Sequence, residues 1–129
     1  MEISERLDVK AVKKVSGAAW ECLRKDFFEI ANTLLSVSAD SKSELTTIYV
    51  KFLPTNGAAD VFAVVWIKSS KKIVVGLALP ESIESSCFVA APQGTKYRGL
   101  TKYFVVTEDA PIPSELTDWA CSAFQNVSS

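Results

Sequence analysis

Hydrophobic positions follow two different spacings along the chain, and the change between them predicts where helices and strands lie. Near the start, Leu7, Ala11 and Val15 recur every four residues, which favours a short helix over residues 3–15 with Ser4 as its N-cap. Residues 1–16 are therefore expected to form a helical extension at the start of one domain that spans residues 1–129.

A second and longer helix is predicted from an apolar stripe with alternating spacings of three and four residues. Charged residues occupy the opposite face, so the helix is amphipathic. Ser16 is the expected N-cap, and the polar run over residues 36–43 is expected to end the helix and form a loop. The stripe consists of Trp20, Leu23, Phe27, Ile30 and Leu34.

The middle of the chain changes to a spacing of two, which is typical of β-strands. The run LTTIYVKFL (45–53) alternates, DVFAVVWI (60–67) is apolar on both faces, and IVVGLALP (73–80) follows the short polar loop KSSKK. The doubly apolar run indicates a central strand that is covered on both sides, or one near an interface. The loop before the third run predicts an antiparallel hairpin.

The last part of the chain predicts one further strand and a closing helix. TKYFVVT (101–107) reads as a strand, whereas CFVAAP (87–92) is either a strand or a packed loop. A terminal helix is expected from Ser114 onward. The order predicts an α+β fold with two layers, in which a mainly antiparallel sheet of four to five strands packs against an N-terminal and a C-terminal helix.

Composition narrows the chemistry that this chain can perform. Hydrophobic residues make up 48% and charged residues 22%, and 14 Lys and Arg face 15 Asp and Glu for a net charge of −1. A basic site must therefore be local. No histidine is present, which excludes a serine–histidine or cysteine–histidine nucleophile within the chain. No cofactor and no metal site is predicted.

The three cysteines Cys22, Cys87 and Cys121 lie far apart and lack metal-ligand spacing. Each has apolar neighbours, so all three are expected to be small buried hydrophobic residues rather than reactive thiols. The odd number of cysteines, the start without an apolar signal region and the absence of long apolar runs favour a cytoplasmic protein that does not span a membrane.

The stretch GTKYRGLTKYF (94–104) is the best candidate for a site, and it has two interpretations. As a ligand-binding loop, it would bind a phosphate or a flat anionic ligand through cations, a stacking aromatic ring and a hydroxyl. As a turn before a strand, its Gly94 and Gly99 would only supply special backbone angles. The candidate ligand-binding residues are Lys96, Tyr97, Arg98, Thr101 and Lys102.

A series of short motifs resembles a known family. The motifs are, in chain order, a strand ending in KF, FAVVWIKSSKKIVVGLALP, GTKYRGLTKYFVVT and a helix containing WACSAFQN. Together they are similar to the DUF5655 domain, a small bacterial family of unknown function, over residues 20–127. A more distant likeness is to the YdhG-like α+β fold. The resemblance implies a compact α+β domain without assigned catalytic residues, and it implies a role for residues 96–101 beyond packing.

These observations favour a binding or interaction module without catalytic activity. Self-association as a homodimer is the first hypothesis, because two helices on one face of a sheet leave its doubly apolar strand in need of further cover. The alternative is a binder of a nucleotide or nucleic acid through the loop from Lys96 to Lys102. An enzyme that uses a carboxylate, a lysine or a cysteine is the third interpretation.

Overall fold

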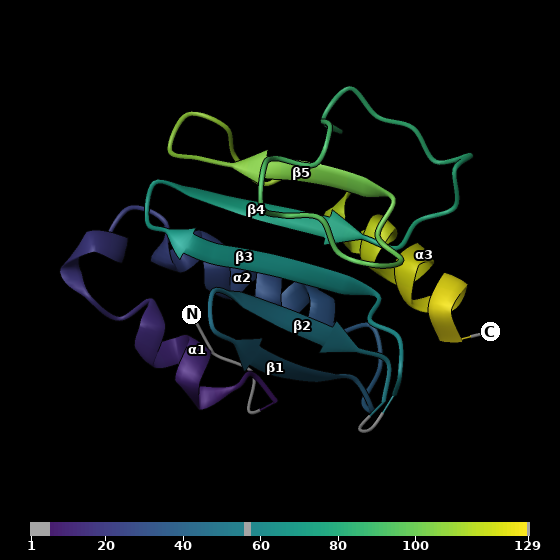
Figure 1. The fold of residues 1–129 in the computed structure, drawn as a ribbon, viewed down its shortest axis with the longest axis horizontal. Helices are drawn as coiled ribbons and strands as arrows, with labels where there is room; N and C mark the ends of the chain where they lie inside the picture. Colours follow the sequence, from purple (N-terminus) through teal and green to yellow (C-terminus); the bar gives the residue numbers. More distant parts are fainter. Residues whose placement is uncertain (1–5, 56–57, 129) are drawn as a thin grey trace.

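One antiparallel sheet of five strands forms the centre of the molecule, and its spatial order is the order of the chain, β1-β2-β3-β4-β5 (Figure 1). The computed structural model describes residues 6–55 and 58–128. The strands are β1 (Lys42–Thr46), β2 (Tyr49–Leu53), β3 (Ala63–Ser69), β4 (Lys72–Leu77) and β5 (Lys102–Val106). The helices are α1 (Val9–Lys14), the short 3-10 helix η1 (Ala18–Trp20), α2 (Arg24–Leu35) and α3 (Leu116–Ser128).

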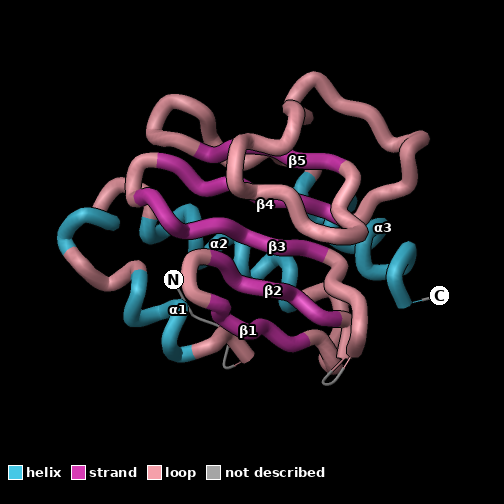
Figure 2. Tube along the Cα trace, in the orientation of Figure 1, coloured by secondary structure: helices cyan, strands magenta, loops and turns pink. Residues whose placement is uncertain are grey.

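The helices α2 and α3 lie together on one face of this sheet, so the predicted two-layer α+β fold is confirmed (Figure 2). Phe27, Ile30 and Leu34 of α2 are fully buried against the sheet, as the stripe in the sequence predicts. Trp119 of α3 packs on Phe104 of β5 with 5.8 Å between ring centroids. None of the described helices is long and apolar enough to cross a membrane.

The first helix begins later than the sequence pattern predicts. Asp8 is its N-cap, because its carboxylate accepts a hydrogen bond of 2.9 Å from the backbone N–H of Lys10. The other carboxylate oxygen accepts a hydrogen bond of 2.9 Å from the backbone N–H of Leu45 and so attaches α1 to β1. The predicted cap Ser4 lies outside the described residues.

The predicted start of the second helix is wrong. Ser16 does not cap it; its hydroxyl donates to the carbonyl oxygen of Lys13 at 2.7 Å. The guanidinium of Arg24 instead donates to the carbonyl oxygens of Val15 at 2.7 Å and Gly17 at 2.6 Å. In a continuous helix these carbonyl oxygens would accept hydrogen bonds from backbone N–H groups four residues later. Here the guanidinium takes that place, the 3-10 helix η1 lies between α1 and α2, and α2 begins at Arg24.

The prediction of one strand over residues 45–53 is also wrong. That stretch contains a tight hairpin, with Leu45 of β1 opposite Val50 of β2. Thr47 in the turn has a positive φ of 45°, which few β-branched residues adopt. The strand β1 begins at Lys42, within the run predicted as loop. Its polar residues can form a strand because it is the edge of the sheet, where Lys42 and Glu44 are exposed while their backbones pair with β2.

The central strand β3 is buried on both faces, as the sequence predicts, and all of Ala63 to Ile67 is buried. The helices cover one face. Residues 91–100, here called the covering loop, lie over part of the other face in front of β4 (Figure 1). The second apolar cluster beneath this loop contains Leu53, Val61, Val64, Trp66, Val74 and Tyr103.

Candidate ligand-binding face

The covering loop contains most of the stretch that the sequence singles out, and two glycines shape it. Gly94 has a φ of 81° and Gly99 a φ of 93°, both in the left-handed region that favours glycine. The turn-forming role predicted for both glycines is therefore confirmed.

A third glycine lets the covering loop come close to the sheet. Gly76 of β4 has no side chain, and Leu100 of the loop occupies the space above it. A Cβ atom at this position would lie 2.6 Å from Leu100 Cδ1 and 2.9 Å from Tyr103 Cε2. The absence of a side chain at Gly76 therefore lets the loop lie against the strand.

Tyr97 fixes the tip of the covering loop to the sheet while leaving part of its ring exposed. Its ring lies edge-on to that of Tyr49 in β2, with 5.7 Å between centroids. Its backbone N–H donates to the hydroxyl of Tyr103 at 3.3 Å. Tyr49 in turn packs on the buried Trp66 at 5.8 Å. Tyr49 and Tyr97 are both half-buried, so they form an aromatic surface at the margin of the loop.

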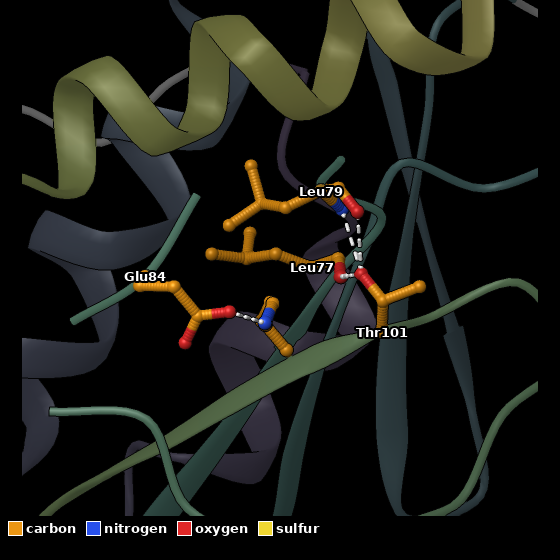
Figure 3. Close-up of polar contacts among 5 residues, drawn as sticks. Leu77, Leu79, Glu84 and Thr101 are labelled. Atoms are coloured by element: carbon orange, nitrogen blue, oxygen red, sulfur yellow. Dashed lines mark hydrogen bonds and ion pairs between the residues drawn. The ribbon is translucent and has the colours of Figure 1, made fainter. Parts of the chain in front are cut away.

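The hydrogen-bonding groups of Thr101 bond to the backbone of the same chain (Figure 3). Its hydroxyl donates to the carbonyl oxygen of Leu79 at 2.6 Å and accepts from the backbone N–H of Leu79 at 3.1 Å. Its backbone N–H donates to the carbonyl oxygen of Leu77 at 3.0 Å. These bonds join the end of the covering loop to the end of β4.

Lys102 also has partners within the chain, and it lies on the other face. It pairs with Leu77 across β4 and β5, and directly opposed residues share a face, so its side chain lies on the helix side of the sheet. Its ammonium group is 2.8 Å from a carboxylate oxygen of Glu84, a contact drawn in Figure 3, and 5.8 Å from the ring centroid of Phe88. Lys102 is therefore separated from Lys96 and Arg98.

Lys96 and Arg98 flank Tyr97 and are exposed, and neither makes an ion pair within the described part of the chain. Lys68 of β3 lies beneath the same loop, with its ammonium nitrogen 3.4 Å from the carbonyl oxygen of Gln93. Three cations from two segments distant in sequence therefore lie close to the covering loop.

The register of the strands extends this group of cations across the sheet. Strand residues opposite or two apart from members of the second cluster share its face, and these include Lys42, Lys51 and Lys72. Glu44 is the only carboxylate in any of the five strands, and it lies 3.6 Å from Lys51. We call this surface the cationic face; its residues are Lys42, Lys51, Lys68, Lys72, Lys96 and Arg98.

Sequence reasoning found Lys96 and Arg98 but missed the four lysines on the strands. The signal for Lys51 and Lys68 was present, because each stands two residues after an aromatic residue of its own strand, Tyr49 or Trp66. What the sequence did not provide was the register that brings β1 to β4 side by side.

The prediction that the cysteines are buried is wrong, since Cys22, Cys87 and Cys121 are all exposed. Cys22 lies in the turn between η1 and α2, and Cys87 lies in the long loop before β5. Cys121 follows the buried Ala120 in α3 and faces outward. Apolar sequence neighbours did not indicate burial here, because adjacent helix positions point in different directions.

Comparison with protein-family models, with curated proteins and with solved structures found no match. The resemblance to the DUF5655 domain stays a prediction, and the cationic face rests on its own geometry.

Proposed function

We propose that this protein is a binding module that holds single-stranded nucleic acid on the cationic face. One observation carries the proposal: the side of the sheet opposite the helices presents six cations, and the only strand carboxylate there is Glu44. The net charge of the chain is −1, so this concentration of positive charge reflects placement rather than composition.

The extent of the face favours a chain of phosphates over a single phosphate group. Its cations come from β1, β2, β3, β4 and the covering loop, and four adjacent strands span about 14 Å at a spacing of about 4.8 Å. Lys72 and Lys42 stand on the outer two of these strands. Several phosphates of one strand match this separation.

The aromatic surface formed by Tyr49 and Tyr97 favours binding of single-stranded nucleic acid over a duplex. Unpaired bases stack on aromatic side chains, whereas the bases of a duplex are already stacked on one another. Tyr97 and Tyr49 are half-buried and stand among the cations, with Lys96 and Arg98 beside Tyr97 and Lys51 two residues after Tyr49. A base can therefore contact a ring while its phosphate contacts an ammonium or guanidinium group.

Self-association was the first hypothesis from sequence, and it stays a prediction. The reasoning behind it was that the doubly apolar strand needed a second subunit for cover. In the structure, the covering loop of the same chain packs on that strand's second face. Light scattering at tens of micromolar protein tests the oligomeric state separately from nucleic-acid binding.

The test is a titration of a fluorescein-labelled oligothymidine of about 15 nucleotides, followed by anisotropy at about 50 and 200 mM salt. We expect binding by the wild type to weaken steeply with salt. In the double variant Lys96→Ala/Arg98→Ala, two fewer phosphate contacts reduce the salt slope by about 1.4. The ratio of affinities at the two salt concentrations then falls by about sevenfold.

The matched control is the double variant Lys13→Ala/Lys25→Ala, which removes the same charge from exposed positions on α1 and α2. It is expected to keep the wild-type salt slope. The proposal is wrong if the wild type does not bind at low salt, or if the two double variants lose affinity equally. Tighter binding of a duplex of the same length would contradict the role assigned to Tyr49 and Tyr97.

A further inference from the structure

Glu44 is the only carboxylate in the five strands, and it stands among the cations of the cationic face. It belongs to β1, the edge strand beside β2, and lies directly opposite Lys51 (Figure 1). The ammonium nitrogen of Lys51 is 3.6 Å from a carboxylate oxygen of Glu44, whose side chain is 58% exposed. Neither carboxylate oxygen accepts a hydrogen bond from a described residue. An exposed ion pair of this kind adds little stability, so both of its groups can also bond to a ligand.

The aromatic ring of Tyr49 is a neighbour of this ion pair. Thr46 lies opposite Tyr49 across β1 and β2, and Glu44 is two residues before Thr46, so the Glu44 side chain shares the face of the ring. Diagonal neighbours of this kind are about 7 to 8 Å apart, within the reach of long side chains. The ring contacts of Tyr49 come from Trp66 in β3 and Tyr97 in the covering loop. A base can therefore stack on Tyr49 from the side of β1, with its edge toward the ion pair.

The bases differ in the groups that their Watson–Crick edges offer to such a pair. Guanine presents the acceptor O6 and, next to it, two adjacent donors, N1–H and the N2 amino group. Thymine, cytosine and adenine have no two adjacent donors on this edge. An ionised carboxylate accepts through two oxygens, whereas an ammonium group only donates. A carboxylate beside an ammonium group therefore matches the acceptor and the two donors of guanine.

We propose that Glu44 and Lys51 select guanine at the nucleotide that stacks on Tyr49; this inference rests on the proposed binding of single-stranded nucleic acid to the cationic face. The carboxylate of Glu44 accepts from N1–H and the N2 amino group of guanine, and the ammonium group of Lys51 donates to O6. With any other base one oxygen of the carboxylate lacks a donor, and an unmatched polar group costs affinity. Recognition of this edge requires an unpaired base, as in a single strand.

The cations of the face could favour guanine by a different contact. Lysine and arginine commonly donate to O6 and N7 of guanine, and this contact involves no carboxylate. Two base analogues separate the alternatives. Hypoxanthine keeps O6, N1–H and N7 but lacks the N2 amino group, whereas 7-deazaguanine keeps the whole Watson–Crick edge but lacks N7.

The probes are fluorescein-labelled oligonucleotides of about 15 nucleotides, measured by anisotropy at about 50 mM salt. The reference is oligothymidine, and in the other strands three separated thymines are replaced by guanine, hypoxanthine or 7-deazaguanine. We expect the wild type to bind the guanine and 7-deazaguanine strands about tenfold more tightly than oligothymidine. The hypoxanthine strand is expected to stay within about threefold of oligothymidine, because it lacks the second donor.

The variant Glu44→Gln keeps the length of the side chain but removes one of its two acceptors. Its preference for guanine is expected to fall to about threefold or less. Its affinity for oligothymidine should equal or exceed that of the wild type, since a negative charge leaves the face, and this result also shows that the variant is folded. The matched control Glu21→Gln removes a carboxylate from the exposed turn before α2 and is expected to keep the tenfold preference.

The outcomes distinguish this inference from the proposed function. Equal affinity of the wild type for the guanine strand and oligothymidine, with salt-sensitive binding of both, would overturn the inference and leave the proposed function standing. A guanine preference that survives Glu44→Gln, or that disappears with 7-deazaguanine, would assign the preference to the cations and overturn the role of Glu44. No binding of any strand at low salt would contradict the proposed function, and the inference with it.

Discussion

At the level of single residues, the hydroxyl of Thr101 could bond to a ligand, but in the structure it bonds to the backbone of Leu79 instead. Thr101→Val keeps the shape but removes the hydroxyl that contacts both backbone groups of Leu79. We expect the variant to lose about 1 to 2 kcal/mol of unfolding free energy, measured by urea denaturation. Thr101→Ser is the control and should stay close to the wild type. Equal stability of the valine variant and the wild type would contradict this role.

For some candidate site residues the sequence could predict exposure, but for others it could not predict a partner within the chain. Lys96 and Arg98 stand in a glycine-bounded loop, and local sequence was enough to indicate that they are exposed. Lys102 has the same chemistry, but its partner Glu84 lies 18 residues away in the chain. A contact of that kind depends on how the loop before β5 folds back, which no local pattern reports.

At the scale of elements, the covering loop depends on close approach to β4. Gly76→Ala introduces a Cβ within 2.6 Å of Leu100 Cδ1 and 2.9 Å of a ring carbon of Tyr103. We expect a loss of about 1 to 3 kcal/mol in unfolding free energy and faster hydrogen exchange in residues 94–100. Gly17→Ala is the control, since nothing lies within 4 Å of a Cβ there, and its stability should change by less than about 1 kcal/mol.

Elements with a strong pattern were predicted well, and those fixed by distant contacts were not. The doubly apolar run of β3 and the strand predicted over residues 101–107 are confirmed, and in that strand Phe104 lies on the helix side and Tyr103 on the other. The start of α2 was missed because it depends on the hydrogen bonds of Arg24 to the segment before it. The turn at Thr47 was missed because a threonine with positive φ carries no turn signal in sequence.

At the scale of the whole molecule, the two layers differ in charge. The helix layer has mixed charge, with Lys10, Lys13 and Lys14 on α1 and, on α2 and α3, the carboxylates Asp26, Glu29 and Asp118 against Arg24 and Lys25. The opposite side of the sheet carries the cationic face. A chain with a net charge of −1 therefore has one side on which cations clearly outnumber carboxylates, and the attraction that this side would exert on a polyanion weakens as salt screens it. Composition does not reveal this distribution of charge, because the register of the strands brings the cations together.

We propose that nucleic acid binds the side of the sheet opposite the helices. The most direct test is a ¹⁵N NMR titration of the wild-type protein with oligothymidine at low salt. We predict shifts for the backbone amides of residues 49–51 and 95–99 and for the indole N–H of Trp66, with little change in α2 and α3. Shifts confined to the helices, or none in the presence of excess oligonucleotide, would show that the cationic face does not bind nucleic acid.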